Sequence, residues 1–326
     1  MPIDVSQLKP VELYTLNSLP RGKEYKGAIL NNCTIPYSSL TVNMDGLCFL
    51  CRCDAHLPIS VGEITDFTRL EDIWSNPIAN ELQSTIDQKE YTYCAVNHCG
   101  ILNQDLHNKE YYISINIDES CNLSCPTCRK QAILHTNGAV YNTKSRQINH
   151  FVQLIQEFNE PMLLSMSGNG DPLASSIMRP LFLNWKPKEN QKVKLFTNGL
   201  LMSKLLPNSP ILPYIKEFQI SVDAGSTDVY EQVRRPGKFN ILQNNLDWLR
   251  NNQPLNSDVR LMFCLSSANA LDIINFANLC QQFEFRGEIT KVDNWYTFDD
   301  FNQIDVIGNI DHPLRGQRSE EHTSEL

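Results

Sequence analysis

The stretch that decides the fold is YYISINIDESCNLSCPTC, residues 111–128, in which an apolar segment runs directly into three cysteines. Residues 111–118 are rich in β-branched and aromatic side chains, a composition typical of a β-strand. The loop that follows reads C-x₃-C-x₂-C and places Cys121, Cys125 and Cys128 within eight residues. Because thiolates bind iron–sulfur clusters and zinc, we expect a metal site where this strand ends.

The spacing of the triplet favours a [4Fe–4S] cluster over zinc. Three thiolates can each bind one iron and leave the fourth iron open, whereas electron-transfer clusters usually close that position with another cysteine. A structural zinc site needs four ligands, commonly from paired C-x₂-C motifs. The triplet therefore predicts a cluster at which a further molecule binds.

Strand-like and helical segments alternate along the rest of the chain, which predicts βαβ units and a parallel sheet. Six such units favour an α/β fold with a partial (β/α)6 TIM-like barrel over a Rossmann sheet, and in either fold ligands bind at the carboxyl ends of the strands. The further strands are expected at 161–167, 192–199, 215–224, 258–267 and 287–295, and the helices at 146–158, 239–252 and 270–283.

Polar loops follow several of these strands. SGNGDP (167–172) combines glycines, which allow close backbone approach, with a carboxylate that suits an ammonium group. TNG (197–199) ends the next strand, and ISVDA (220–224) ends the one after it. These loops predict a binding site for a ligand at the carboxyl ends of the strands.

The triplet and these loops, in this order, resemble the radical S-adenosylmethionine (radical SAM) superfamily over about residues 111–310. The resemblance implies that the open iron binds S-adenosylmethionine (SAM). Reductive cleavage then gives methionine and a 5′-deoxyadenosyl radical, which takes a hydrogen atom from a substrate. The residues implied in cofactor binding are Gly168, Asn169, Gly170, Asp171, Asn198, Ser221, Asp223 and Arg234.

The sequence departs from that superfamily at three positions. Thr127 stands where an aromatic residue usually precedes the third cysteine. The loop that resembles the usual G-G-E-P element contains Asn169, and Asp171 replaces its glutamate. No lysine, tyrosine or cysteine can be assigned as the catalytic acid or base.

Residues 1–110 lack the βαβ rhythm and hold six of the eleven cysteines. This region is similar to the auxiliary module called SPASM, or its shorter form, twitch, in the order of its features. These are Cys33, an Asp-Gly turn followed by further cysteines, a helix at 72–86 and YCAVNHC (93–99). That module usually follows the barrel, and here it precedes it. The ligands that the resemblance implies for a second [4Fe–4S] cluster are Cys33, Cys51, Cys94 and Cys99, with Cys48 or Cys53 as substitutes for Cys51.

A structural zinc site remains an alternative for this second group, with His98 as a possible ligand. The two resemblances together imply a small cysteine-rich iron–sulfur domain at 1–110, a radical SAM core at 111–310 and the start of a C-terminal segment at 311–317. Residues 318–326, RSEEHTSEL, resemble a translated sequencing adapter, so the natural chain is expected to continue past about Gln317.

The composition of the chain argues against nucleic acid and membranes as partners, and it bears on the cellular compartment. The formal net charge of −9 and the lack of a basic patch argue against nucleic acid as a partner. No stretch approaches the roughly 20 apolar residues of a membrane span, and Met1–Leu19 lacks the pattern of a secretion signal. Cysteines used as metal ligands fit a reducing compartment, so we expect a cytoplasmic protein with no membrane partner.

The sequence thus predicts an oxygen-sensitive radical SAM enzyme that acts on a peptide, protein or small molecule, with a peptide or protein favoured. An electron donor such as flavodoxin or ferredoxin is implied. The alternatives are a tRNA- or metabolite-modifying radical SAM enzyme and a non-catalytic iron–sulfur electron carrier. The glycine-rich loop favours a catalyst, because an electron carrier needs no pocket for an amino acid.

Overall fold

The structure is a computed structural model that describes residues 33–53, 56–96, 99, 110–166 and 169–315. Gly168 and His98 lie outside the described residues, as do residues 318–326 and the end of the 311–317 segment.

One nine-stranded sheet organises the chain, with the strand order β3-β2-β1-β4-β5-β6-β7-β8-β9. Strands β4 to β9 are all parallel and follow one another in chain order. This sequential order is that of a partial barrel and not of a Rossmann sheet, so the predicted fold class is confirmed. The strands are β1 (Ser39–Val42), β2 (Leu47–Phe49), β3 (Ser60–Glu63), β4 (Tyr111–Ile115), β5 (Met162–Met166), β6 (Gln191–Thr197), β7 (Ile215–Ser221), β8 (Asp258–Leu265) and β9 (Arg286–Lys291).

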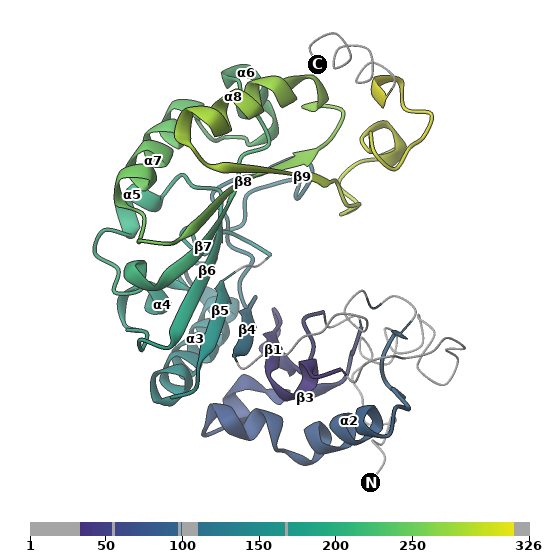
Figure 1. Cartoon of the computed structure of the whole chain (residues 1–326), viewed down its shortest axis with the longest axis vertical. Helices are drawn as coiled ribbons and strands as arrows, with labels where there is room; N and C mark the ends of the chain where they lie inside the picture. Colours follow the sequence, from purple (N-terminus) through teal and green to yellow (C-terminus); the bar gives the residue numbers. More distant parts are fainter. Residues whose placement is uncertain (1–32, 54–55, 97–98, 100–109, 167–168, 316–326) are drawn as a thin grey trace.

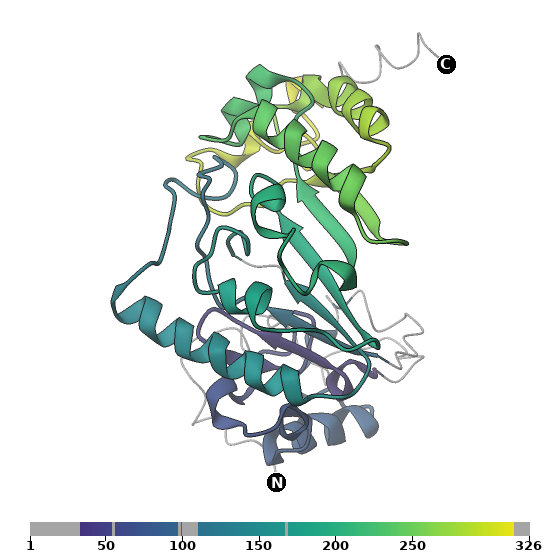
Figure 2. The ribbon, with the colours of Figure 1, turned by 90° about the vertical axis from the view of Figure 1, so that its left-hand side faces the viewer.

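Helices α3 to α8 cover the convex side of the curved sheet (Figure 1), and Figure 2 shows these helices from their outer side. The helices are α2 (Pro77–Asp87), α3 (Gly138–Glu157), α4 (Arg179–Leu183), α5 (Met202–Leu205), α6 (Thr227–Val233), α7 (Phe239–Asn252) and α8 (Ile273–Phe283). Short 3₁₀ turns are η3 (Ile35–Tyr37), η4 (Ile64–Asp66), η5 (Leu70–Trp74), η7 (Leu212–Tyr214), η8 (Ala270–Asp272) and η9 (Phe301–Gln303).

The concave face of the sheet is only partly covered. Along β8 every second side chain is buried, and the residues between them, such as Arg260 and Met262, are half-buried. A parallel sheet with both faces covered is apolar and buried throughout. The alternation therefore leaves the face of the sheet along β8 accessible to a ligand.

The N-terminal region extends this sheet. Strand β1 pairs in parallel with β4, from Ser39 opposite Tyr112 to Val42 opposite Ile115, and β2 and β3 continue the sheet as antiparallel strands. One hydrophobic core runs across residue 110, from Ile35 to Val306. The sequence did not predict this continuity, because β1 and β2 are too short to show a period; the domain division at 110 stays a prediction.

Helix α3 and the aromatic cluster beside it hold the N-terminal strands against the barrel. The Trp74 ring lies 4.7 Å from that of Tyr111 and 6.3 Å from that of Phe158, measured between centroids. Its Nε1 donates to the carbonyl of Ser39 at 3.0 Å. From α3, Gln147 Nε2 donates to the carbonyl of Asp45 at 2.8 Å. Aromatic packing and hydrogen bonds thus join the two regions.

The helix predicted at 72–86 is divided in two, because Pro77 begins α2 after the short η5 turn. Asn76 caps α2 by accepting from the backbone N–H groups of Ile78 and Ala79, both at 3.0 Å. Proline suits the first helical position, where its missing N–H would have no helical partner.

Helix α3 begins at Gly138, earlier than the predicted start at residue 146. The prediction missed its first two turns because they lack apolar residues at helical spacing. None of the helices in the described part of the chain combines the length and the apolar character needed to cross a membrane.

Candidate functional site

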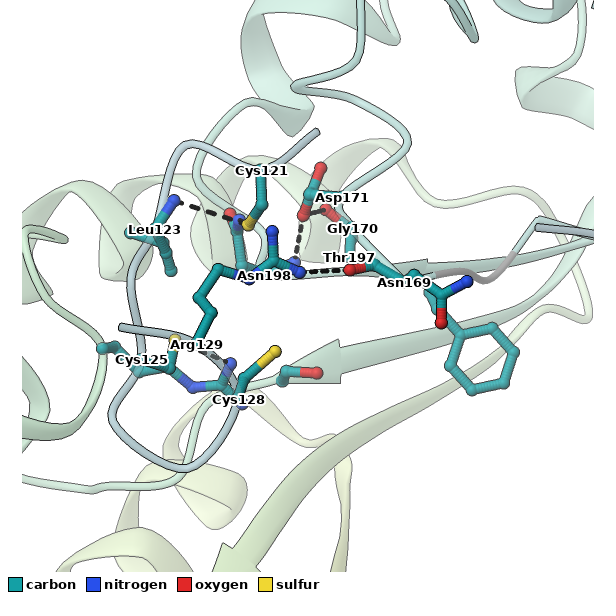
Figure 3. Close-up of a pocket in the computed structure, with 13 residues that line it drawn as sticks. Cys121, Leu123, Cys125, Cys128, Arg129, Asn169, Gly170, Asp171, Thr197 and Asn198 are labelled. Atoms are coloured by element: carbon teal, nitrogen blue, oxygen red, sulfur yellow. Dashed lines mark hydrogen bonds between the residues drawn. The ribbon is translucent and has the colours of Figure 1, made fainter. Parts of the chain in front are cut away.

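A cavity of about 220 Å³ opens at the carboxyl ends of β4 to β7 (Figure 3). The fold brings together there residues that are widely separated in the sequence. The predicted residues that line the cavity are the three cysteines Cys121, Cys125 and Cys128, together with Asn169, Gly170, Asp171, Asn198, Ser221 and Arg234. Asp223 lies behind Arg234 and does not line the cavity.

The cysteine loop is held by its own backbone. Cys121 N–H donates to the carbonyl of Ile133 at 2.7 Å, and Cys128 N–H donates to that of Cys125 at 2.9 Å. Cys125 is buried, Cys121 half-buried and Cys128 exposed. Burial raises the pKa of the Cys121 thiol to about 11, and burial also raises the pKa of Cys125. Metal binding must therefore displace protons from these thiols.

The glycine-rich loop rests directly on the cysteine loop. A Cβ on Gly170 would lie 2.3 Å from the carbonyl oxygen of Ser120, the residue before the first cysteine. Next to it, Asp171 N–H donates to that same carbonyl at 2.8 Å. Only glycine allows this approach. Three thiols that line one cavity are a donor set that fits an iron–sulfur cluster, and the glycine-rich loop packed against them borders the same cavity.

The carboxylate of Asp171 is fully engaged by the protein. Its Oδ2 accepts from Thr197 Oγ1 at 2.9 Å and from Asn198 N–H at 2.6 Å. Its Oδ1 accepts from the N–H groups of Leu173 at 2.9 Å and Ala174 at 3.1 Å. Burial raises the pKa of Asp171, and these hydrogen bonds oppose the rise. The carboxylate thus ties the glycine-rich loop to the end of β6.

Asn198 links the end of β6 to the cysteine loop. Its Nδ2 donates to Asn122 Oδ1 at 2.8 Å and lies 3.9 Å from Cys121 Sγ. Hydrogen bonds to thiolate sulfurs tune iron–sulfur clusters. This position gives Asn198 a contact with the cysteine loop that the sequence did not predict.

Four cavity residues were not predicted from the sequence: Leu123, Arg129, Phe196 and Thr197. Arg129 donates NH1 to the carbonyl of Glu119 at 2.7 Å and also bonds the carbonyl of Asn169, so it bridges the two loops. Its place directly after Cys128 was the available signal, since a cation there faces thiolates. Phe196 offered a weaker signal, because it precedes the TNG turn at the end of an alternating strand.

The N-terminal cysteines meet at a second, smaller cavity. Its lining includes the four predicted ligands Cys33, Cys51, Cys94 and Cys99, with His56 and the apolar residues Pro36, Leu57, Tyr91 and Ala95. Cys48 and Cys53 are not among its lining residues.

An apolar cluster of Ile86, Tyr91 and Val96 packs against three of these cysteines, Cys33, Cys94 and Cys99. Burial raises the pKa of Cys33, and it raises that of Cys51 to about 12. Within the described ranges, no three histidine, cysteine, aspartate or glutamate side chains form a group that could hold a single metal ion.

A family model described as SPASM, an iron–sulfur cluster-binding domain, matches residues 33–100. This match confirms the predicted SPASM-like module upstream of the barrel. A comparison with curated proteins found no match.

Several solved structures are similar in fold. Coproporphyrinogen III oxidase (HemN) from Escherichia coli, a radical SAM enzyme, is 13% identical over 66% of this chain and 51% of its own, with a TM-score of 0.44. SuiB from Streptococcus suis bound to precursor peptide SuiA is 12% identical over 66% of this chain and 46% of its own, with a TM-score of 0.39. TYW1 with a lysine-pyruvate adduct is 16% identical over 62% and 70%, with a TM-score of 0.39. The chain thus spans about half the length of HemN and of SuiB.

Proposed function

We propose that this chain, a radical SAM protein with an N-terminal SPASM module, is an enzyme that cleaves SAM and abstracts a hydrogen atom from a peptide or protein. One observation carries the proposal: the cysteine triplet, the glycine-rich loop and the end of β6 meet at one cavity at the carboxyl ends of the parallel strands. When bound, the cluster and SAM supply a 5′-deoxyadenosyl radical as the hydrogen-abstracting species.

The protein's part in this reaction is to hold and orient. Cys121, Cys125 and Cys128 would bind three irons and leave the fourth open to the cofactor. Because Gly170 has no side chain, its loop packs closely against the backbone before Cys121, while Asn169 and Ser221 line the same cavity. Asp171 keeps the glycine-rich loop and Asn198 in place.

We propose that the Phe196 ring contacts the adenine of SAM. The position that is usually aromatic before the third cysteine holds Thr127, which does not line the cavity, whereas Phe196 does. Lys194 Nζ lies 5.0 Å from the centre of the Phe196 ring. We place the aromatic surface for the adenine on β6 instead of on the cysteine loop.

For the second cavity we propose an auxiliary [4Fe–4S] cluster on Cys33, Cys51, Cys94 and Cys99. The match to an iron–sulfur domain and the convergence of these four cysteines support it. Cys51 is favoured over Cys48 and Cys53 because Cys51 alone of the three lines the cavity.

The SPASM module favours a peptide or protein as substrate, because enzymes with this two-module arrangement often modify peptides or proteins. The half-buried side chains along β8 offer a surface on which an extended chain could lie. Flavodoxin or ferredoxin is the proposed class of electron donor and the cytoplasm the proposed location.

The reaction is tested by anaerobic reconstitution of the full chain with iron and sulfide, followed by dithionite and SAM. We expect methionine and 5′-deoxyadenosine in equal amounts, measured by mass spectrometry. The Cys280→Ala variant is the matched control, because Cys280 lies on α8 and outside both cavities. A spectroscopically confirmed triplet cluster that yields no 5′-deoxyadenosine would refute the proposal.

The substrate class is tested with deuterium. A candidate precursor peptide, chosen by searching the genes beside that of this protein and prepared with deuterated side chains, should transfer deuterium to 5′-deoxyadenosine. Bulk tRNA prepared in the same way should not. Transfer from tRNA alone would replace the peptide with the nucleic-acid alternative.

A further inference from the structure

Two consecutive arginines after α6 hold the middle of the cysteine loop. Ser124 N–H donates to the carbonyl of Arg235 at 2.8 Å, and Arg235 Nε donates back to the carbonyl of Ser124 at 3.0 Å. These reciprocal bonds fix the residue next to Cys125. They bring the end of α6 onto the loop, although the two segments are far apart in the sequence.

The first of the two arginines reaches a thiol. Arg234 NH1 donates to Cys125 Sγ at 3.6 Å, while its NH2 forms an ion pair with Asp223 Oδ2 at 2.7 Å. Both partners of the ion pair are almost fully buried, with 13% and 5% of their side chains exposed. The guanidinium thus bridges a buried carboxylate and the sulfur of a proposed cluster ligand.

Asp223 is itself fixed by the neighbouring strand. Its Oδ1 accepts from Cys264 N–H at 2.7 Å, and its carbonyl accepts from Asn269 Nδ2 at 2.9 Å. Because the Asp223 carboxylate is held in place, its ion pair with Arg234 fixes the orientation of the guanidinium. Its Nε is buried and has no hydrogen-bond partner among the described residues, so its bonding through NH1 and NH2 defines its position.

We propose that Arg234, with Asp223 as its counter-ion, is a positioning residue that stabilises the reduced cluster by donating a hydrogen bond to Cys125 Sγ. The inference rests on the proposed function, since it requires the cluster on the triplet. Reduction adds a negative charge to the cluster. A positively charged donor hydrogen-bonded to a buried ligand sulfur such as that of Cys125 raises the reduction potential and so makes the electron easier to accept.

This role differs from binding the carboxylate of SAM, which the resemblance to the family implies for Arg234. A residue that serves the cofactor alone affects cofactor affinity and leaves the SAM-free cluster unchanged. A residue that serves the cluster changes the cluster potential before any SAM is added.

The decisive experiment is a redox titration of the reconstituted full chain without SAM, followed by electron paramagnetic resonance. The signal of the triplet cluster is identified as the one lost in Cys125→Ala. We expect a more negative midpoint potential in Arg234→Gln, and a smaller shift of the same sign in Arg234→Lys, which keeps the charge but not the planar fork. Arg250→Gln, at an exposed ion pair with Glu284, should leave the potential unchanged.

An unchanged potential in Arg234→Gln overturns the inference, and weaker SAM binding in that variant would assign Arg234 to the cofactor instead. A second measurement needs no Arg234 variant. Wild-type protein labelled with ¹⁵N-arginine should show nitrogen coupling to the reduced, SAM-free cluster, and this coupling should survive Arg129→Lys. Absence of any such coupling also overturns the inference.

The outcome is separable from that of the proposed reaction. A cluster whose potential responds to Arg234, in a protein that forms no 5′-deoxyadenosine, contradicts the reaction and leaves the inference standing. A protein that produces 5′-deoxyadenosine but whose cluster potential does not change in Arg234→Gln supports the reaction and contradicts the inference.

Discussion

The two cysteine sites differ in their surroundings more than in their ligands. The triplet lies at an open cavity among charged and amide side chains, including Arg129, Arg234 and Asn198. The N-terminal four surround a smaller cavity with a mostly apolar lining, such as Leu57 and Tyr91. A cluster in polar surroundings with room beside it can bind a further molecule, whereas one at a small cavity with an apolar lining is suited to structure or electron transfer. The comparison favours catalysis at the first site and a structural or electron-transfer role at the second.

The largest expected effect is the loss of the first site. Cys125→Ala removes the buried ligand of the triplet, so 5′-deoxyadenosine formation should fall to background while the N-terminal cluster remains. Iron analysis and mass spectrometry measure both quantities in one preparation. Cys280→Ala, the matched control, should retain both. Full activity in Cys125→Ala would show that the triplet does not hold the reacting cluster.

The second prediction concerns the choice of ligand in the N-terminal site. Cys51→Ala should remove about four irons per chain, the content of one [4Fe–4S] cluster. Cys48→Ala should keep them, because Cys48 is buried in β2 and does not line the cavity. Iron and sulfide analysis decides between the two residues. Retention of one zinc ion in place of iron in the wild-type protein would establish the alternative metal.

The sequence predicted the first site better than the second for a physical reason. The triplet is contiguous, so its spacing alone indicates a shared ligand, and Gly170 and Asn198 follow strands whose carboxyl ends must meet at one edge of the sheet. The four cysteines proposed as ligands of the N-terminal site come from separate positions between Cys33 and Cys99. The sequence favoured Cys51 but kept Cys48 and Cys53 as substitutes, and in the fold Cys51 alone of the three lines the cavity.

The barrel strands were predictable because each has a period or a β-branched run long enough to recognise. The pairing of β1 with β4 was not, since four residues carry too little pattern and the partner is about 70 residues away in the sequence. Arg129 and Phe196 were missed for a related reason. Their positions beside Cys128 and the TNG turn were only weak signals, because a single side chain becomes a site residue through its neighbours in space.

The third prediction concerns the buried charges that set the first site apart. Asp223→Asn leaves the Arg234 guanidinium buried without its counter-ion, so the free energy of unfolding should fall by about 3–5 kcal/mol. Urea denaturation under anaerobic conditions measures the change. Asp258→Asn is the control: it loses ion pairs with the half-buried Arg260 and the exposed Arg286, its own side chain is 31% exposed, and the change should cost about 1 kcal/mol or less. Equal effects in the two variants would show that the Asp223–Arg234 pair is not buried in solution.

The smallest effect concerns the junction between the two regions. Trp74→Phe keeps an aromatic ring against Tyr111 but removes the Nε1–H that bonds the carbonyl of Ser39, so it should cost about 1 kcal/mol. Because β1 is hydrogen-bonded to β4, that loss should appear in a single unfolding transition that involves both regions. Trp295→Phe, at an exposed position, should leave the stability unchanged. Two separate transitions, with only the first shifted in Trp74→Phe, would show instead that the SPASM module folds as a unit of its own and that the shared sheet contributes little to its stability.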